Sequence, residues 1–489
     1  MKKTINAILI VAGISMGGCN SLIDLQPESI ISVNSFWKTA EDAQGGLYGM
    51  YTQFRTFAQS ELILLGEARS EVMGHGIQNA DYRIKYFENT LTASNADRNW
   101  LQLYRIINSA NLVIKYVPGI SFSNDQNKNK TLAQAYAMRA YCYFVLARTW
   151  GDVPIVLDPV EGYNPETTFK VRSPQAEVFA LIKSDIETAL PLFTNNQFEN
   201  GRSLWSKPAV NLLKADVFLW TAKRNGGGNT DATTALQALN DAESADVGLL
   251  DNFSQVFAYG NKGNREIILA VRFADLEATT NFYADMYIGP SDLPASADDD
   301  VKQAIGTPGG LNWWAPTSTM RNQFKTDDTR RAASFVEIYR NDNGNRTFQT
   351  SVVVKGKGFV EAGARRFLDD IVIYRYADLI LLKAEAKNLL GQNPSEEINK
   401  IRQRAYGTNF PSHAYTSGTA AENDEVILQE RLFEFAFEGK RWWDLVRFGK
   451  AFEKVPSLQG KEGQQHLLLW PLTVEALSLN SKLTQTNGY

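Results

Sequence analysis

The hydrophobic residues of this chain recur with a helical period over most of its length. Apolar residues at spacings of three and four form one stripe from Trp100 to Ile114 and a second from Leu132 to Ala147. Further helices are predicted over 173–191, 206–225, 374–390 and 394–406, and another that begins near Asn34 or Ser35. Short turns join these helices in pairs, and an isolated pair cannot bury its apolar face. The pattern therefore predicts a mainly α fold, a tetratricopeptide-like superhelix of stacked helical hairpins.

The segment 250–370 breaks this pattern. Gly, Pro, Asn and Asp recur there, and strand-like runs such as Ile267–Val271 and Ser351–Val354 are short. We expect long loops with small β-hairpins that pack on the helical scaffold. Insertions of this length without regular structure usually carry function.

The first residues have the pattern of an export signal. Lys2 and Lys3 precede the apolar stretch 5–14, which is too short to span a bilayer, and small residues lead to Cys19. This predicts a lipoprotein signal peptide at 1–18, a lipid-modified Cys19 and a tether over 19–33. The alternative is an ordinary secretory signal with a chance cysteine. The other cysteine, Cys142, then has no partner for an intrachain disulfide.

Composition excludes some classes of protein. The chain has 489 residues, 44% of them apolar, which is far too hydrophobic for a disordered chain. Its net charge is −4, and no basic run is long enough to follow a phosphate backbone, so we predict no nucleic-acid partner.

The densest group of charged residues lies between 430 and 447. Glu430, Glu434, Glu438 and Arg441 would form one stripe if this stretch were a continuous helix. Two of the acids could act as the acid and base of a glycosidase. The alternative, which we favour, is an ion-pair network that holds the helix to its neighbours.

No metal or cofactor is predicted. The three histidines are far apart in the sequence, and no phosphate loop, dinucleotide fingerprint or nucleophile elbow is present. The run Asp298–Asp300 could supply oxygen ligands to calcium, but it lacks an EF-hand spacing, so we favour a solvated acidic loop.

Aromatic residues in the loop-rich segment are better candidates for a binding site. Trp313 and Trp314 are adjacent in a Gly- and Pro-rich stretch, outside any apolar stripe, and Tyr283 and Tyr287 are four residues apart. Sugars present C–H faces that stack on aromatic rings, so exposed rings here would suit a carbohydrate. The alternative is that these rings attach the loop to the scaffold.

A polar loop at 74–83 is the second candidate. Its residues Asn79, Tyr82 and Arg83 carry amide, phenol and guanidinium groups that can hydrogen-bond sugar hydroxyls. An ordinary solvated loop has the same composition, so the pattern alone leaves both interpretations open.

Four ordered blocks resemble one family, the SusD/RagB surface lipoproteins that work with TonB-dependent outer-membrane transporters. They are Arg139–Phe144 with Trp150–Pro154, Arg375–Ala386 with Ile398–Ala405, Glu430–Arg447, and Trp470–Leu472 with the terminal Gly488–Tyr489. Thr473 and Thr486 depart from the usual final block. The resemblance implies a SusD-like fold, with helical repeats over 34–249, a variable ligand-binding segment over 250–370, and a C-terminal repeat with the family signature over 371–489.

The resemblance also implies a function. It indicates a lipid-anchored protein on the outer face of the outer membrane that binds an oligosaccharide or polysaccharide and acts as a lid over a SusC-like, TonB-dependent transporter, without catalysis. A peptide-binding lipoprotein of the same family is the first alternative. A glycoside hydrolase built from helical hairpins is the second.

Overall fold

Helices build most of the molecule in the computed structural model, which describes residues 36–78, 81–162 and 164–489. The predicted signal, Cys19 and the tether lie outside these residues. The helices of the first half are α3 (Ala40–Ala58), α4 (Glu61–Glu67), α5 (Ile84–Phe87), α6 (Leu101–Tyr116), α7 (Asp125–Trp150), α8 (Pro165–Thr168), α9 (Gln175–Ala189), α10 (Lys207–Arg224) and α11 (Gly228–Glu243). Those of the C-terminal part are α16 (Tyr376–Leu389), α17 (Ser395–Tyr406), α18 (Ala420–Phe435), α19 (Arg441–Arg447), α20 (Ala451–Lys454) and α21 (Val474–Leu479).

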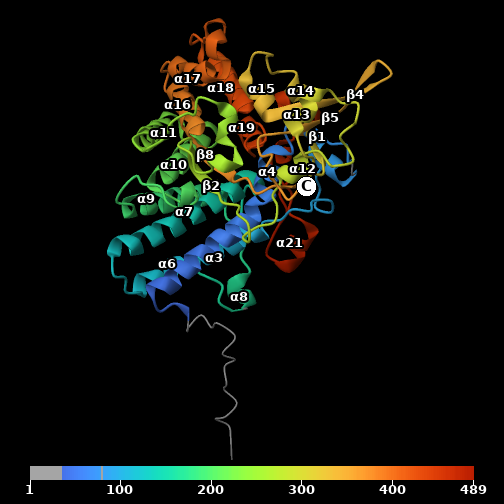
Figure 1. Cartoon of the computed structure of the whole chain (residues 1–489). Helices are drawn as coiled ribbons and strands as arrows, with labels where there is room; N and C mark the ends of the chain where they lie inside the picture. The colour runs from blue at the N-terminus through green and yellow to red at the C-terminus, as the bar shows by residue number, and fades with distance from the viewer. Residues whose placement is uncertain (1–35, 79–80, 163) are drawn as a thin grey trace, which may run out of the picture.

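The long helices pack in series. α3 contacts α6, α6 contacts α7, α7 contacts α9, and α9 contacts α10. The series continues through α11 and α16 to α17 and α18, so it runs from the lower part of Figure 1 to its top. This confirms the predicted mainly α architecture of stacked hairpins. Among the described helices, none is both long enough and apolar enough to cross a membrane.

Local sequence signals explain where several helices begin. The Ser206 side chain accepts a hydrogen bond from the backbone N–H of Ala209, and Pro208 stands in the first turn of α10, as predicted. The cap of α3 is Thr39, which forms a reciprocal capping box with Asp42. The predicted caps Asn34 and Ser35 lie outside the described residues.

Short elements make up the middle of the chain. Its helices are α12 (Tyr283–Met286), α13 (Asp299–Ile305), α14 (Ser318–Arg321) and α15 (Thr329–Ser334). The part of the chain that the structure describes forms four antiparallel strand pairs: β1 (Met73–His75) with β3 (Trp314–Pro316), β2 (Ile267–Val271) with β8 (Ile371–Arg375), β4 (Phe335–Asp342) with β5 (Asn345–Val353), and β6 (Phe359–Glu361) with β7 (Ala364–Arg366). The predicted small hairpins are therefore present, and β2 of this segment pairs with β8, which leads into α16.

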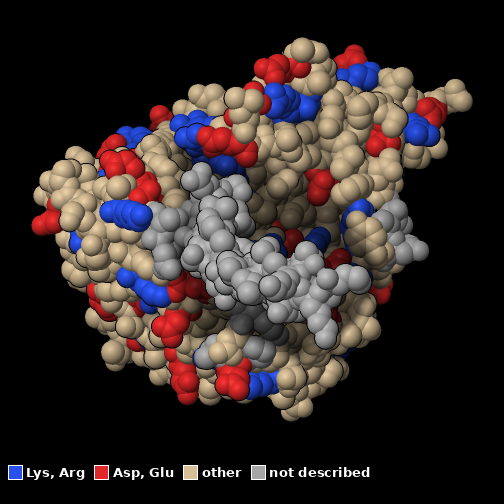
Figure 2. All heavy atoms as spheres, turned by 90° about the horizontal axis from the view of Figure 1, so that it is seen from below, with Lys and Arg blue, Asp and Glu red and all other residues tan. Residues whose placement is uncertain are grey.

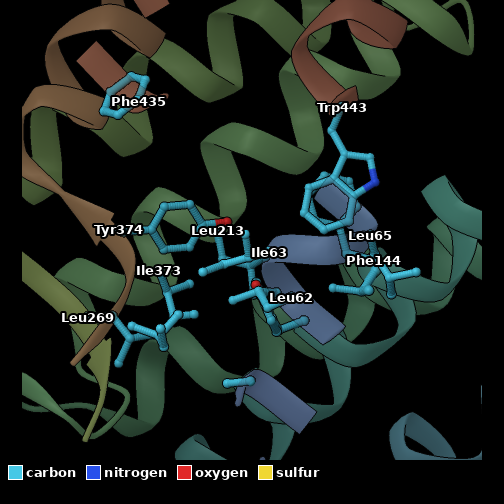
Figure 3. Packing of buried hydrophobic residues seen from close by; sticks show 14 of the residues in the cluster. Leu62, Ile63, Leu65, Phe144, Leu213, Leu269, Ile373, Tyr374, Phe435 and Trp443 are labelled. Atoms are coloured by element: carbon cyan, nitrogen blue, oxygen red, sulfur yellow. The ribbon is translucent and has the colours of Figure 1, made fainter. Parts of the chain in front are cut away.

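A large hydrophobic cluster joins these parts, beside two small ones. Figure 3 shows Leu62, Ile63 and Leu65 of α4 near Phe144 of α7, with Trp443 of α19 above them. Side chains from β2 and β8 complete the cluster, so residues more than 370 positions apart share one interior. The loop-rich segment is thus fixed on a rigid scaffold, which a precise binding site requires.

Candidate functional site

The two loops that the sequence singled out separately meet at one short strand pair. His75 of β1 pairs with Trp314 of β3, and Met73 pairs with Pro316. The backbone N–H of Gly76 continues the contact by donating to the carbonyl of Trp313 at 3.2 Å. The approach is so close that a Cβ on Gly76 would lie 1.8 Å from the carbonyl oxygen of Asn312, so only glycine fits there.

Asn312 is the residue that fixes this junction. It is fully buried, and its φ of 42° is one that asparagine tolerates better than most residues. Its side-chain oxygen accepts hydrogen bonds from the N–H of Ile77 at 2.9 Å and from the Thr350 hydroxyl at 2.7 Å. Its amide donates to the Ser351 carbonyl at 3.1 Å. One side chain thereby connects the 74–83 loop, the loop before β3 and strand β5.

Next to Asn312, an arginine orders two aromatic rings. The Arg83 guanidinium carbon lies 4.6 Å from the centre of the Trp313 ring and 4.9 Å from that of Tyr82. Arg83 also donates to the Tyr82 hydroxyl at 3.0 Å and to the carbonyls of Gln78 and Trp313 at 3.1 and 3.4 Å. Tyr82 is 54% exposed and Trp313 is half-buried, whereas Arg83 is only 2% exposed. Tyr82 therefore faces solvent, Trp313 is partly exposed, and the buried Arg83 lies against both rings.

Polar groups surround these rings. The Gln78 amide donates to both carboxylate oxygens of Asp292, at 3.1 and 3.2 Å, on the surface of the protein. The backbone carbonyl of Asp285 accepts a hydrogen bond from the backbone N–H of Trp313 at 2.7 Å. Burial raises the pKa of the Asp285 carboxyl to about 6, and the charges of Arg83 and Arg98 oppose that rise. The site thus combines ring faces with hydrogen-bonding groups, the combination that recognises sugars.

Three of the predicted ring residues are not available to a ligand. Trp314 is 3% exposed because it points to the other face of β3, where it packs against Phe87 and Phe282. Tyr287 is buried and donates its hydroxyl to the Ile305 carbonyl. Tyr283 is buried against Gly356, where a Cβ would lie 2.2 Å from its ring. The prediction that these three rings are exposed for stacking on a sugar is wrong. They hold the loops to the scaffold instead. Asn79 lies outside the described residues.

The carboxylates of the C-terminal block are buried and paired. Arg375 bonds Glu434 at 2.6 Å and Glu438 at 2.9 Å, and Arg330 bonds Glu430 at 3.0 Å. A further set of pairs joins Glu430 to Arg402, Glu434 to Arg404, Glu438 to Lys355, and Arg441 to Glu71. This is the ion-pair network that we favoured over a glycosidase pair, and its oxygens are turned away from solvent.

The predicted single helical stripe through this block is wrong. α18 ends at Phe435, and α19 begins at Arg441. Between them, Phe437 and Gly439 have φ of 68° and 72°, which an α-helix cannot contain. The buried Glu67 carboxylate accepts the N–H groups of Phe437 and Lys440 in this turn, at 2.9 and 3.0 Å. The break turns Glu438 toward Arg375 and Lys355.

The acidic run at 298–300 is divided between different partners. Asp298 accepts hydrogen bonds from Arg346 at 3.0 Å and Asn341 at 2.7 Å, which lower the pKa of its carboxyl. Asp299 pairs with Lys302 at 3.1 Å, within α13. Asp298 thus attaches this loop to the β4–β5 hairpin.

Sequence reasoning missed Asn312, Gln78, Asp292 and Asp285 as parts of the site. The sequence does carry a signal for Asn312. Asparagine adopts positive φ more readily than most residues, and Asn312 lies between Gly310 and a buried strand, where the chain turns. No comparable signal marks the other three. Their relation to Trp313 depends on the folding of loops that are distant in sequence.

Comparisons with known proteins agree with this architecture. Residues 36–219 match a family model described as starch-binding and associating with the outer membrane, and residues 341–466 match the SusD family model. A solved SusD superfamily protein from Bacteroides vulgatus is 31% identical, with a TM-score of 0.84, over 93% of this chain and 100% of its own. The chain belongs to the SusD family.

Other relatives of this SusD-family protein cover between 76% and 99% of its length. The solved structure of B. fragilis NanU is 33% identical, with a TM-score of 0.85, and the match covers 95% of this chain and 100% of that one. SusD-like protein P38 of Formosa agariphila is 28% identical over 99% of this chain and 98% of its own. The starch-binding protein SusD of Bacteroides thetaiotaomicron is 28% identical over 76% of each chain.

The surface charge of this SusD-family protein is mixed. Figure 2 shows lysine and arginine side chains interspersed with aspartate and glutamate over the face seen from below. Among the described residues on that face, no continuous basic stripe is visible.

Proposed function

We propose that this SusD-family protein binds an oligosaccharide or polysaccharide at the cell surface, with Trp313 and Tyr82 as the rings on which sugar units stack. The observation that carries the proposal is the arrangement of both rings on the buried Arg83, with Tyr82 exposed and Trp313 partly exposed. The neighbouring Gln78 and Asp292 offer amide and carboxylate partners for hydroxyl groups. Arg83 is a positioning residue, because its guanidinium is already bonded within the protein.

The proposal includes a place in transport. A lipid on Cys19 would anchor the protein to the outer membrane, and the bound glycan would be delivered to a SusC-like, TonB-dependent transporter beneath it. The SusD-family match supports this role, together with the outer-membrane description of its family model. Two rings, at about 1–3 kcal/mol each by analogy with stacked bases, give modest affinity after ordering costs. Modest affinity suits a protein that must release its ligand.

The direct test is isothermal titration calorimetry against a panel of starch, laminarin, xylan, mannan and pectin, with casein peptides as the alternative cargo. We expect at least one polysaccharide to bind, and Trp313→Ala to weaken that binding about tenfold or more, because a stacking surface is lost. Tyr82→Ala should weaken it by a smaller factor. Tyr48→Ala, which removes an exposed tyrosine from α3, is the matched control and should leave the affinity unchanged.

Two results would contradict the proposal. Binding of peptides without any polysaccharide would favour the peptide-binding alternative. Release of reducing sugar by the wild type, lost in Glu434→Gln, would favour the hydrolase. The burial of Glu434 between Arg330, Arg375 and Arg404 argues against the second result.

A further inference from the structure

A small cavity lies inside the helical scaffold, and none of its lining residues belongs to the proposed glycan site. It has a volume of about 30 Å³, and residues of α4, α7, α10, β8, α16, α18, α19 and the turn between α18 and α19 line it. Figure 3 shows three of the lining side chains, Leu62, Tyr374 and Trp443. The N-terminal and C-terminal parts of the chain therefore meet around this space.

Three of the lining side chains carry buried donors that have no hydrogen-bond partner within the described parts of the chain. They are Nε of Arg148 in α7, Nη1 of Arg431 in α18 and the indole Nε1 of Trp443 in α19, and each side chain belongs to a residue that is at most 5% exposed. Buried donors without a partner are destabilising, so native proteins pair them with protein atoms or with ordered water. The cavity is the space that these three residues share.

The charges of the lining residues balance, which limits the kind of molecule that the cavity can hold. Four cationic and four anionic residues line it, namely Arg148, Arg431, Lys440 and Arg447, and Asp216, Asp378, Glu438 and Asp444. Several of them pair with one another: Arg447 with Asp216 at 3.1 Å and with Asp444 at 3.0 Å, Arg431 with Asp444 at 2.8 Å, and Lys440 with Asp378. An additional ion would leave an unbalanced buried charge, which is costly. The lining therefore favours a neutral molecule.

The size of the cavity restricts that neutral molecule to water. One buried water needs about 10–15 Å³ of such space and typically makes about three hydrogen bonds. A cavity of about 30 Å³ thus has room for two waters but not for a sugar unit. Each water can accept two hydrogen bonds, so two waters can accept all three unpaired donors. Their own hydrogens can then be donated to carboxylates of the lining, such as those of Asp216 and Asp444.

We propose that this cavity is a binding site for two water molecules, which bridge Arg148 of α7 to Arg431 of α18 and Trp443 of α19. The two waters complete the hydrogen bonding where the N-terminal and C-terminal parts of the scaffold meet. Glu438, Gly439 and Lys440 also line the cavity, so the turn that separates α18 from α19 borders the water pair. The inference does not depend on which ligand the protein binds.

The test is a crystal structure of the wild-type protein at a resolution that shows ordered water, together with a second crystal soaked in sodium bromide. The anomalous signal of bromide marks sites that hold anions. We expect two water peaks in the cavity, within hydrogen-bond distance of the three donors, and no bromide peak there. A bromide peak would show that the site takes an anion, and an empty cavity would show that the donors stay unpaired. Either result would overturn the proposal.

Two neighbouring tryptophans provide matched variants. Trp443→Phe removes the indole N–H but keeps an aromatic ring beside Arg148, whose guanidinium carbon lies 3.6 Å from the centre of the Trp443 ring. We expect its crystal structure to lose the water next to residue 443 and to keep the one next to Arg431. Trp442→Phe is the control, because Trp442 is also buried with an unpartnered Nε1 but does not line the cavity. Both waters should remain in this control.

The variants and the wild type test different parts of the proposal. Unchanged waters in Trp443→Phe would show that the indole does not bind water, and the proposed bridge to α19 would be wrong. Loss of both waters in Trp442→Phe would show that they depend on general packing rather than on the three donors, which would also contradict the proposal. The wild-type crystals decide whether the site exists even where a variant does not fold.

Discussion

Arg375 and Arg83 are both almost inaccessible to solvent, at 0% and 2% exposed, yet their partners differ in kind. Arg375 donates to the carboxylates of Glu266, Glu434 and Glu438 within 2.6–2.9 Å. Arg83 donates to carbonyl oxygens and to the Tyr82 hydroxyl, and its flat face lies against rings. In the first arrangement, buried carboxylates neutralise the charge of the arginine inside the scaffold. In the second arrangement, the arginine donates to uncharged oxygen atoms, and the aromatic rings beside it remain partly exposed.

The difference shows where a ligand can be recognised. The high charge density of the C-terminal block made it the more conspicuous candidate in the sequence. In the structure, however, its carboxylates are buried and paired with arginine and lysine side chains. Burial raises the pKa of Glu438, but Arg375 and Lys355 outweigh this effect and lower that pKa to about 2. Such a group remains ionised at neutral pH and gives up no proton to a substrate. The loop segment, with a lower density of charge, is where an exposed ring and exposed polar groups remain accessible.

The sharpest test of this comparison is to remove the central arginine of the scaffold. Arg375→Met leaves Glu266, Glu434 and Glu438 buried with fewer cations, so we expect the free energy of unfolding to fall by about 3–5 kcal/mol. Urea denaturation followed by tryptophan fluorescence would measure the loss. While the variant is folded, its affinity for the glycan identified by the panel should stay within twofold of wild type.

The matched control is Arg366→Met. Arg366 also pairs with two carboxylates, of Asp275 and Glu361, but it lies on the exposed strand β7. Exposed pairs contribute little, so this variant should lose far less stability than Arg375→Met. If the two variants were equally stable, the network would not be what holds the scaffold together.

A smaller effect is expected from Asn312, which joins the scaffold to the site. Asn312→Ala removes three hydrogen bonds and places alanine at a φ of 42°, so we expect a loss of about 1–3 kcal/mol in unfolding free energy. Because Trp313 follows directly, glycan affinity should fall too. Asn312→Gly separates the causes, since glycine accepts positive φ but restores no hydrogen bond.

Two outcomes distinguish the roles of Asn312. If Asn312→Gly recovers stability but not glycan affinity, the hydrogen bonds position the ring and the strain accounts for the stability loss. If both variants bind glycan as wild type does, Asn312 does not position Trp313. Unfolding curves and calorimetric titrations on the same preparations decide between these results.

The helical scaffold could be predicted from the sequence because its signals are local. The stripe from Trp100 to Ile114 became α6, and the cap at Ser206 became the start of α10. The prediction failed at 436–440, where positive φ at Phe437 and Gly439 ends one helix and redirects the chain. There the turn is stabilised by Glu67, a residue some 370 positions away, and no local pattern contains that information.

The sequence could predict which loops form the site, but not which of their side chains are accessible. Trp313 and Trp314 are adjacent, so on a strand they point to opposite faces, and a shift of one residue in the pairing would exchange them. The pairing of His75 with Trp314 decides that Trp314 is buried and Trp313 is not. Composition could identify both loops, but only the register could assign the accessible ring.

The smallest expected effect is a pH dependence that differs in sign between the two regions. Glu438, with its lowered pKa, stabilises the fold above about pH 4.5 and loses that contribution as the pH falls toward 2. Asp285 in the site has the opposite behaviour. Its folded pKa of about 6 exceeds the ordinary value of 3.8, so the folded state holds the proton longer, and stability falls as the pH rises from about 4 to 6.

Asp285→Asn isolates the contribution of Asp285 to the pH dependence of stability. Asparagine does not ionise, and Glu438 is unchanged between the variant and the wild type. Asp285 is partly exposed and solvent screens its charge, so we expect the variant to gain about 1–2 kcal/mol relative to wild type between pH 4 and pH 7. Urea midpoints measured at intervals across this range would show the gain as a widening difference between the two curves. Parallel curves would mean that Asp285 ionises alike in the folded and unfolded chains, and the site beneath Trp313 would then be more open to water than its packing indicates.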